Sequence, residues 1–151
     1  MVEDSVKVLA LKILGSRNLS EREMQKRLVG KGVTEESAQE TVVWLVDIGA
    51  INDKEYASMI VSHYCAKGYG GARIRDELYR RGISRDLWED ALDGVEGAED
   101  SAFAFLEKKL RGSSEKADLR RATDALCRRG YSYEEARVAV GKYVERVQGD
   151  G

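Results

Sequence analysis

A short motif recurs three times in this chain and constrains its fold more than any other feature. Each copy places a leucine four residues before a glycine and a large apolar residue directly after it. The glycines are Gly32, Gly82 and Gly130, which lie 50 and 48 residues apart. Glycine readily adopts the left-handed backbone that closes a helix, so each motif predicts a helix end. The regular spacing predicts three copies of one structural unit.

The residues around the three glycines agree with one another. The leucines are Leu28, Leu78 and Leu126, and the apolar residues that follow the glycines are Val33, Ile83 and Tyr131. A packing contact that is repeated in each unit produces such agreement. A hydroxyl residue comes next in every copy, as Thr34, Ser84 and Ser132. We expect each of these hydroxyls to cap the helix that follows.

Apolar residues recur at helical spacing on both sides of each motif. The first helix carries Val6, Ile13 and Leu14, and Ser20 with Glu23 forms the pattern of a capping box for the second. Counted in this way, the chain contains about nine helices and belongs to the all-α class. We predict three tandem three-helix repeats, covering residues 1–50, 51–96 and 97–148.

The composition supports a helical protein that stays in the cytoplasm. The chain contains no proline, and 42% of its residues are hydrophobic while 34% are charged. No apolar run approaches the roughly 20 residues that span a membrane. The start, Met1 to Asp4, lacks the basic and apolar regions of a signal peptide. We therefore expect a cytoplasmic protein without a membrane partner.

The sequence offers no catalytic, metal or cofactor site. Its one histidine, His63, lies two residues from Cys65, so the two side chains point to different sides of a helix. Cys65 and Cys127 form no CxxC pair, and we expect buried thiols. The glycine-rich stretch at residues 68–71 lacks the Lys-Ser/Thr ending of a phosphate loop and is predicted to be a link. We expect a protein that is not an enzyme and needs no cofactor.

Charge alternates along the chain. Residues 67–88 carry 6 basic and 3 acidic side chains, residues 89–100 carry 6 acidic and no basic ones, and residues 101–129 carry 8 basic and 4 acidic ones. Arg73 and Arg81 lie eight residues apart, as do Arg121 and Arg129, so each pair shares a helix face. These blocks suggest a basic surface for an acidic partner, either a phosphate backbone or an acidic protein surface.

Single basic residues have an ordinary alternative role. Cations in a last helical turn complement the helix dipole, and Asp76–Arg80 and Asp124–Arg128 have the spacing of intrahelical ion pairs. As a set, the basic residues are our candidates for partner binding: Arg73, Arg75, Arg80, Arg81, Arg120, Arg121, Arg128, Arg129, Lys108 and Lys109. Trp44 and Trp88 are expected in the core, whereas Tyr69 and Tyr79 could either be buried or stack on a partner.

The ordered set of motifs resembles the bacterial regulatory RecX family over nearly the whole chain. Its structural positions are Gly32, Gly82, Gly130, Asp53, Tyr56 and Ala57. The set reads Arg17-x-x-Ser20-x-x-Glu23, Leu28-x-x-Lys31-Gly32, Gly49-x-Ile51-Asn52-Asp53-x-x-Tyr56-Ala57, Lys67-Gly68, Arg73-Ile74-x-x-Glu77-Leu78-x-x-Arg81-Gly82-Ile83 and Ala125-Leu126-x-x-Arg129-Gly130-Tyr131. The pair Gly70-Gly71 departs from the family pattern, so the residue at which the helix containing Arg73 starts stays open.

This resemblance implies an elongated, curved array of repeats that binds the RecA recombinase. Proteins of this family lie in the groove of the RecA filament on single-stranded DNA and lower its ATPase, strand-exchange and coprotease activities. The resemblance thus implies a regulator of recombinational DNA repair and the SOS response. We also expect a monomer, and weak direct contact of the arginine pairs with DNA phosphates stays open. It supplies no catalytic residues.

Two other functions stay open from the residues alone. A helix, a glycine turn and a second helix also describe a DNA-binding helix-turn-helix protein. The expected third helices begin Glu35-Glu36, Arg85-Asp86 and Glu134-Glu135, which places carboxylates where such a protein reads DNA. A helical scaffold for an unrelated protein partner is the other alternative.

Overall fold

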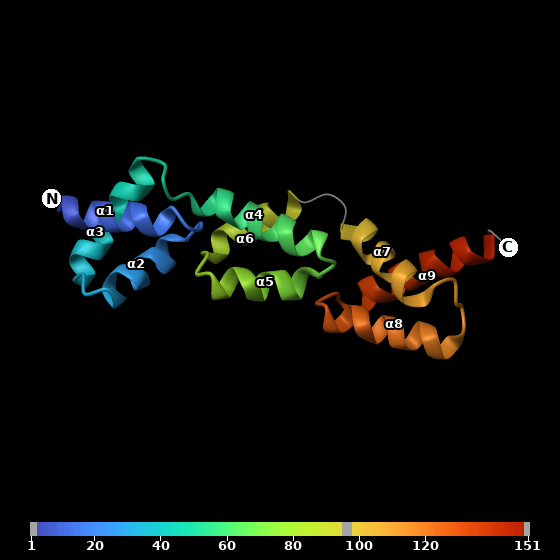
Figure 1. Cartoon of the computed structure of the whole chain (residues 1–151). Helices are drawn as coiled ribbons and strands as arrows, with labels where there is room; N and C mark the ends of the chain where they lie inside the picture. The colour runs from blue at the N-terminus through green and yellow to red at the C-terminus, as the bar shows by residue number, and fades with distance from the viewer. Residues whose placement is uncertain (1–2, 95–97, 150–151) are drawn as a thin grey trace.

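The structure, a computed structural model of the chain, describes residues 3–94 and 98–149. These residues form nine α-helices and one short 3-10 helix and contain no strand, which confirms the all-α prediction. Figure 1 shows the helices in an elongated row with the two termini at opposite ends. The helices are α1 (Asp4–Leu14), α2 (Glu21–Gly30), α3 (Glu35–Asp47), α4 (Asp53–Ala66), α5 (Gly71–Arg80), η1 (Arg85–Leu87), α6 (Trp88–Asp93), α7 (Ala98–Leu110), α8 (Lys116–Arg128) and α9 (Tyr133–Gly149).

Three of the four hydroxyl caps that the sequence predicts are present, at Ser20, Thr34 and Ser132. Ser20 and Glu23 form a reciprocal capping box at the start of α2. Thr34 accepts a hydrogen bond from the Ser37 amide at the start of α3. Ser132 and Glu135 exchange the same pair of bonds before α9, at 3.1 and 2.8 Å. Each such cap contributes about 1 kcal/mol because it satisfies amides that lack a partner within the helix.

The prediction for Ser84 is wrong. Its side chain makes no capping hydrogen bond, and the chain continues into η1 before α6. The Leu87 amide donates to the Ser84 carbonyl, which is the bond of a 3-10 turn. The Trp88 indole donates to the Ile83 carbonyl at 2.9 Å and fixes this tight entry. The third helix of the second repeat is therefore short, with six residues in α6.

The three motif glycines end their helices in the left-handed conformation. Their φ angles are +95° at Gly32, +75° at Gly82 and +102° at Gly130. The amide that follows each glycine donates to the carbonyl of the motif leucine four residues before that glycine. This is the hydrogen bond of a Schellman helix end, as the motif predicts.

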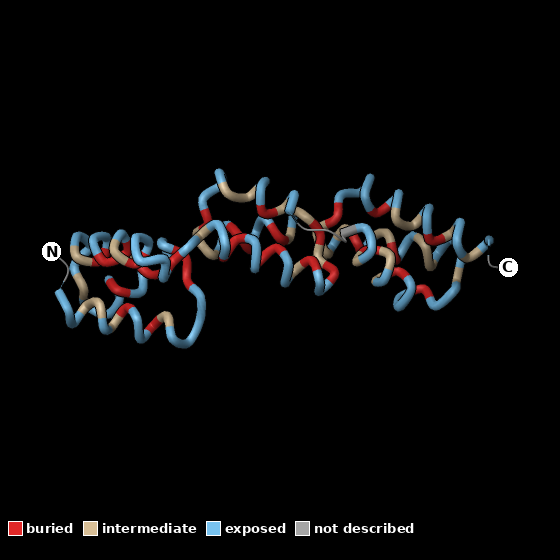
Figure 2. The backbone as a smooth tube through the Cα atoms, turned by 90° about the horizontal axis from the view of Figure 1, so that it is seen from above, coloured by how far each residue is buried: buried red, intermediate tan, exposed pale blue. Residues whose placement is uncertain are grey.

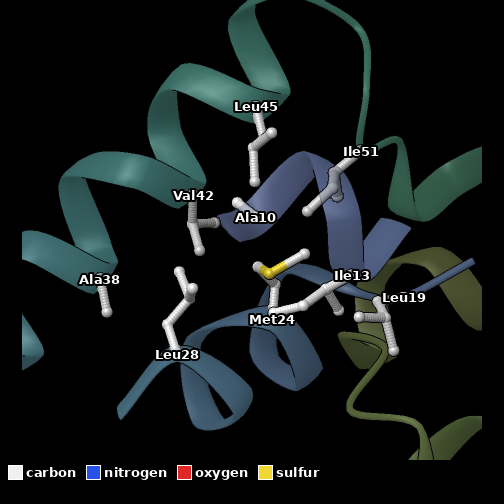
Figure 3. Close-up of a cluster of buried hydrophobic side chains, with 9 residues drawn as sticks. All are labelled: Ala10, Ile13, Leu19, Met24, Leu28, Ala38, Val42, Leu45 and Ile51. Carbon is white, nitrogen blue, oxygen red and sulfur yellow. The ribbon is translucent and has the colours of Figure 1, made fainter. Parts of the chain in front are cut away.

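Each repeat has its own core, and a motif leucine lies at the centre of each one. Leu28, Leu78 and Leu126 are fully buried in three separate clusters. In the first cluster, Met24 and Leu28 from α2 face Val42 and Leu45 from α3 (Figure 3). Buried positions recur along the whole row (Figure 2). A helix pair buries too little alone, so each core needs all the helices of its repeat.

The borders between repeats remain a prediction. Ile51, just past the expected first border, packs into the first core. The expected border between residues 96 and 97 lies outside the described residues. Trp44 and Trp88 are half-buried against the first and second cores, so their expected burial is only partial. Cys65 is buried as expected, whereas Cys127 is half-buried.

Candidate functional site

The middle helices of the three repeats follow one another end to end. Helices α2, α5 and α8 line one edge of the row in Figure 1, and the end of each later helix meets the start of the preceding one. This order places the C-terminus of each later helix against the N-terminus of the middle helix before it. The helix dipoles are therefore aligned favourably. We call the two meeting points the first joint (α5 on α2) and the second joint (α8 on α5).

The second joint is made by backbone hydrogen bonds. The Gly70 amide donates to the Arg129 carbonyl at 2.8 Å, and the Ala72 amide donates to the Gly130 carbonyl at 3.0 Å. A Cβ on Gly130 would lie 2.5 Å from the Arg73 nitrogen, so only glycine allows this approach. The sequence predicts a link at residues 68–71. In the structure α5 instead starts at Gly71, and the end of α8 packs closely on Gly70.

The first joint is made by side chains. The buried Ser20 hydroxyl donates to the Arg81 carbonyl, while the Glu21 amide donates to Asp53 Oδ1 at 3.0 Å. Gly82 packs on the aliphatic part of Arg22, 2.8 Å from where a Cβ would be. Burial, with the Glu21 and Glu23 charges, raises the pKa of Asp53 to about 6 against the one lowering contribution of the Glu21 amide bond.

The Arg81 side chain is held within the second repeat and does not project freely beside Arg73. Its Nη1 donates to the Tyr56 hydroxyl at 2.7 Å, and its Nε donates to Glu77 at 3.1 Å. Partial burial lowers the pKa of the guanidinium, but the bonds to Tyr56 and Glu77 outweigh it and raise the pKa overall. The family positions Tyr56 and Ala57 are both buried in the second core. Arg81 therefore connects helices α4 and α5.

Arg73 and Arg129 lie at the second joint. Their guanidinium carbons are 5.3 and 5.1 Å from the centre of the Tyr69 ring, and Arg129 is also 4.7 Å from the Phe105 ring. The half-buried Tyr69 thus stacks within the protein, whereas Tyr79 is 65% exposed. Arg121, predicted to share a face with Arg129, is exposed and pairs with Asp118. The Asp118 pKa is lowered by the Ser113 hydroxyl and by Arg121.

The other candidate cations are exposed. Arg80 pairs with Asp76 as predicted, and Arg75 pairs with Glu89 at 3.1 Å. No ion pair between Asp124 and Arg128 is found within the described ranges. We call the exposed candidate arginines of α5 and α8 the basic row: Arg75 and Arg80 on α5, and Arg120, Arg121 and Arg128 on α8. Lys108 and Lys109 lie exposed on the neighbouring helix α7.

A groove of about 520 Å³ lies between α7 and α9. Phe103, Val138 and Ala139 contribute apolar surface to it, and Glu134 and Glu135 are among its acidic residues. Within residues 3–94 and 98–149, no cluster of His, Cys, Asp and Glu has the arrangement of a metal site. His63 is exposed on α4 while Cys65 is buried, so the two do not form a dyad.

Sequence reasoning missed the contacts that build the joints. Ser20 was recognised only as a cap, although its hydroxyl also reaches a carbonyl 61 residues away. Asp53 was expected at a helix start, and it also receives the amide of Glu21 from another repeat. The departure at Gly70-Gly71 from the family pattern was the one signal of the second joint. None of the described helices is long and apolar enough to cross a membrane.

Comparison with known proteins places the chain in a family. Residues 52–92 match the model of the second three-helix domain of RecX. The regulatory protein RecX of Stenotrophomonas maltophilia (strain R551-3) is 30% identical over 133 residues, which cover 86% of this chain and 82% of the relative. The protein of the same name from Xanthomonas axonopodis pv. citri (strain 306) is 32% identical over 133 residues, which again cover 86% of this chain and 82% of the relative.

Solved structures show the same fold. The crystal structure of RecX from Lactobacillus salivarius matches with a TM-score of 0.84 and 22% identity, covering 92% of this chain and 94% of that one. A second crystal structure of regulatory protein RecX matches with a TM-score of 0.78 and 20% identity, covering 89% and 71%. The repeat fold, the shared sequence and the matched domain agree, and this chain belongs to the RecX family of regulatory proteins.

Proposed function

We propose that this protein binds the RecA nucleoprotein filament on single-stranded DNA and inhibits its ATPase, strand-exchange and coprotease activities. It would act as a cytoplasmic monomer that modulates recombinational DNA repair and the SOS response. Membership of the RecX family is the observation that carries this proposal. An elongated row of repeats also suits a long groove, because it presents an extended surface to its partner.

The basic row is the part of the surface that we propose for the contact, together with Lys108 and Lys109. These side chains are exposed, and α5 and α8 continue one another, so Arg80 and Arg128 occupy equivalent places two residues before their motif glycines. A row of like charges favours an acidic partner and speeds its encounter. Arg73, Arg81 and Arg129 are set apart from this surface because they make contacts inside or between repeats.

An ATPase assay tests the function directly. RecA is assembled on single-stranded DNA and titrated with the protein, and we expect ATP turnover to fall as the protein is added. Turnover that stays constant at saturating protein would refute the proposal. The same titration without RecA, followed by fluorescence anisotropy of a labelled oligonucleotide, measures direct DNA contact. Such contact should weaken with salt, the logarithm of affinity falling by roughly 0.7 per neutralised phosphate against the logarithm of salt concentration.

Charge reversal tests the surface. The variant Arg80→Glu/Arg128→Glu should inhibit RecA at least several-fold more weakly while keeping the helical content of the parent. The matched control is Arg137→Glu/Lys142→Glu on α9, which changes the charge equally at exposed positions outside the basic row. Equal inhibition by both variants would show that the contact lies on another face.

A further inference from the structure

Two arginines from different repeats converge on one tyrosine at the second joint. Arg73 lies in the first turn of α5 and Arg129 caps the end of α8. Both guanidinium carbons lie within 5.3 Å of the Tyr69 ring centre. Arg129 is further sandwiched against Phe105 of α7. Stacking of this kind holds a guanidinium plane in place while leaving the N–H groups at its edges free to bond.

These two cations have no carboxylate partner among the described residues. Arg129 donates Nη1 to the Lys67 backbone carbonyl at 3.1 Å, which leaves its charge without a counter-ion. Arg73 Nε is fully buried and has no hydrogen-bond partner in the described structure. Arg75 and Arg81 of the same helix region, in contrast, each pair with a glutamate. The second joint therefore concentrates positive charge that the protein leaves uncompensated.

The nearby backbone acceptors are already occupied. The carbonyls of Arg129 and Gly130 accept the amides of Gly70 and Ala72, and the Lys67 carbonyl accepts Arg129 itself. A buried donor without an acceptor is unfavourable, and two like charges near one ring repel each other. An acceptor with negative charge, supplied from outside, would satisfy both conditions.

We propose that a phosphate group binds at the second joint, bridging Arg73 and Arg129 across the edge of Tyr69. A tetrahedral dianion suits this place because it offers acceptor oxygens to guanidinium groups that approach from two helices. Its two negative charges also match the two positive charges of Arg73 and Arg129 better than a single carboxylate does. Because one arginine comes from each repeat, a bound phosphate fastens the second repeat to the third. The site does not depend on RecA.

Phosphorus-31 NMR of inorganic phosphate titrated with the full chain tests the site. We expect saturable line broadening with the parent protein, at constant ionic strength set with sodium chloride. The variant Arg73→Gln/Arg129→Gln should bind at least tenfold more weakly. The control Lys26→Gln/Arg27→Gln removes the same charge from exposed positions of α2 and should bind like the parent. Absence of saturable broadening with the parent, or equal loss in both variants, overturns the proposal.

A conservative single variant provides a second test if the double variant does not fold. Arg129→Lys keeps the charge but loses the flat stacking surface and the fork of donors, so we expect weaker binding with unchanged circular dichroism. Parent-like binding by Arg129→Lys would overturn the bridging geometry.

Competition then identifies the source of the phosphate. A short oligothymidylate that displaces inorganic phosphate at lower concentration assigns the site to a nucleic-acid backbone, whereas equal or weaker displacement assigns it to a free anion. Displacement by polyglutamate and not by oligothymidylate would overturn the preference for phosphate. A protein that binds phosphate here but leaves RecA activity unchanged would refute the proposed function and leave this site standing.

Discussion

Replacing Gly130 with alanine should separate the second repeat from the third. An alanine in the left-handed conformation costs roughly 1 to 2 kcal/mol wherever it occurs. At Gly130 the new Cβ would also lie 2.5 Å from the Arg73 nitrogen and 2.6 Å from the Arg73 Cβ, so the backbone of α5 must move away. That movement strains the two amide bonds across the joint, each worth about 0.5 to 1.5 kcal/mol. The total loss should be roughly 2 to 5 kcal/mol.

Gly32→Ala is the matched control, because Gly32 has the same left-handed backbone and nothing within 4 Å of the added Cβ. We expect this variant to lose only the conformational part, about 1 to 2 kcal/mol. Its motif end has no repeat packed on it, so no joint is disturbed.

Urea unfolding followed in two ways distinguishes the variants. Both tryptophans lie in the first two repeats, so fluorescence reports on these repeats while far-UV circular dichroism reports on all helices. Gly130→Ala should shift the circular dichroism transition to lower urea concentration. Part of the fluorescence change should still occur at the higher urea concentration of the parent protein. If Gly130→Ala and Gly32→Ala are destabilised equally, within about 0.5 kcal/mol, the close approach at the second joint is not a constraint.

Two further changes test the first joint, and one tests the contact that holds Arg81. Ser20→Ala removes a cap and the bond to the Arg81 carbonyl, so the free energy of unfolding in urea should fall by about 2 kcal/mol. The control Ser132→Ala removes a cap alone and should lower it by about 1 kcal/mol. Equal losses would contradict the bond across the joint. Tyr56→Phe removes the acceptor of Arg81 and should cost about 1 kcal/mol in the same assay without changing RecA inhibition, and weaker inhibition would indicate that the fixed Arg81 orients the contact surface. The pKa of Asp53 is raised to about 6 in the folded state from its usual value of 3.8, so its charged form opposes folding above pH 6 and this penalty disappears as the pH falls to 3.8. Asp53→Asn should flatten this part of the pH dependence of unfolding, and an unchanged profile would remove Asp53 as its source.

The local parts of the fold could be predicted from the sequence because their determinants lie within a few residues of one another. The capping boxes at Ser20 and Ser132 and the left-handed glycines at Gly32, Gly82 and Gly130 depend on neighbours along the helix. The wrong prediction at Ser84 also has a local cause, because the Trp88 indole bonds to the Ile83 carbonyl five residues away and the chain enters a 3-10 turn there, which the spacing of apolar residues does not indicate.

The candidate site was harder to predict because its arginines are sorted by distant partners. Spacing alone made Arg73 and Arg81 equivalent members of one face. The structure gives Arg81 a hydroxyl from Tyr56, 25 residues away, and places Arg73 beside a glycine from the next repeat. Helical periodicity tells which side chains share a face but not whether another repeat occupies that face. The arginines of the basic row are exposed, and their role in binding a partner stays a prediction.

The unequal joints give the array unequal mechanics. Two backbone hydrogen bonds and the stacked Tyr69 should make the last two repeats move as one rigid body. The described contacts of the first joint include no such backbone bond. Bending and torsion should therefore concentrate between α2 and α5. Under the proposed function, one flexible point of this kind would let the array follow filament grooves of different pitch.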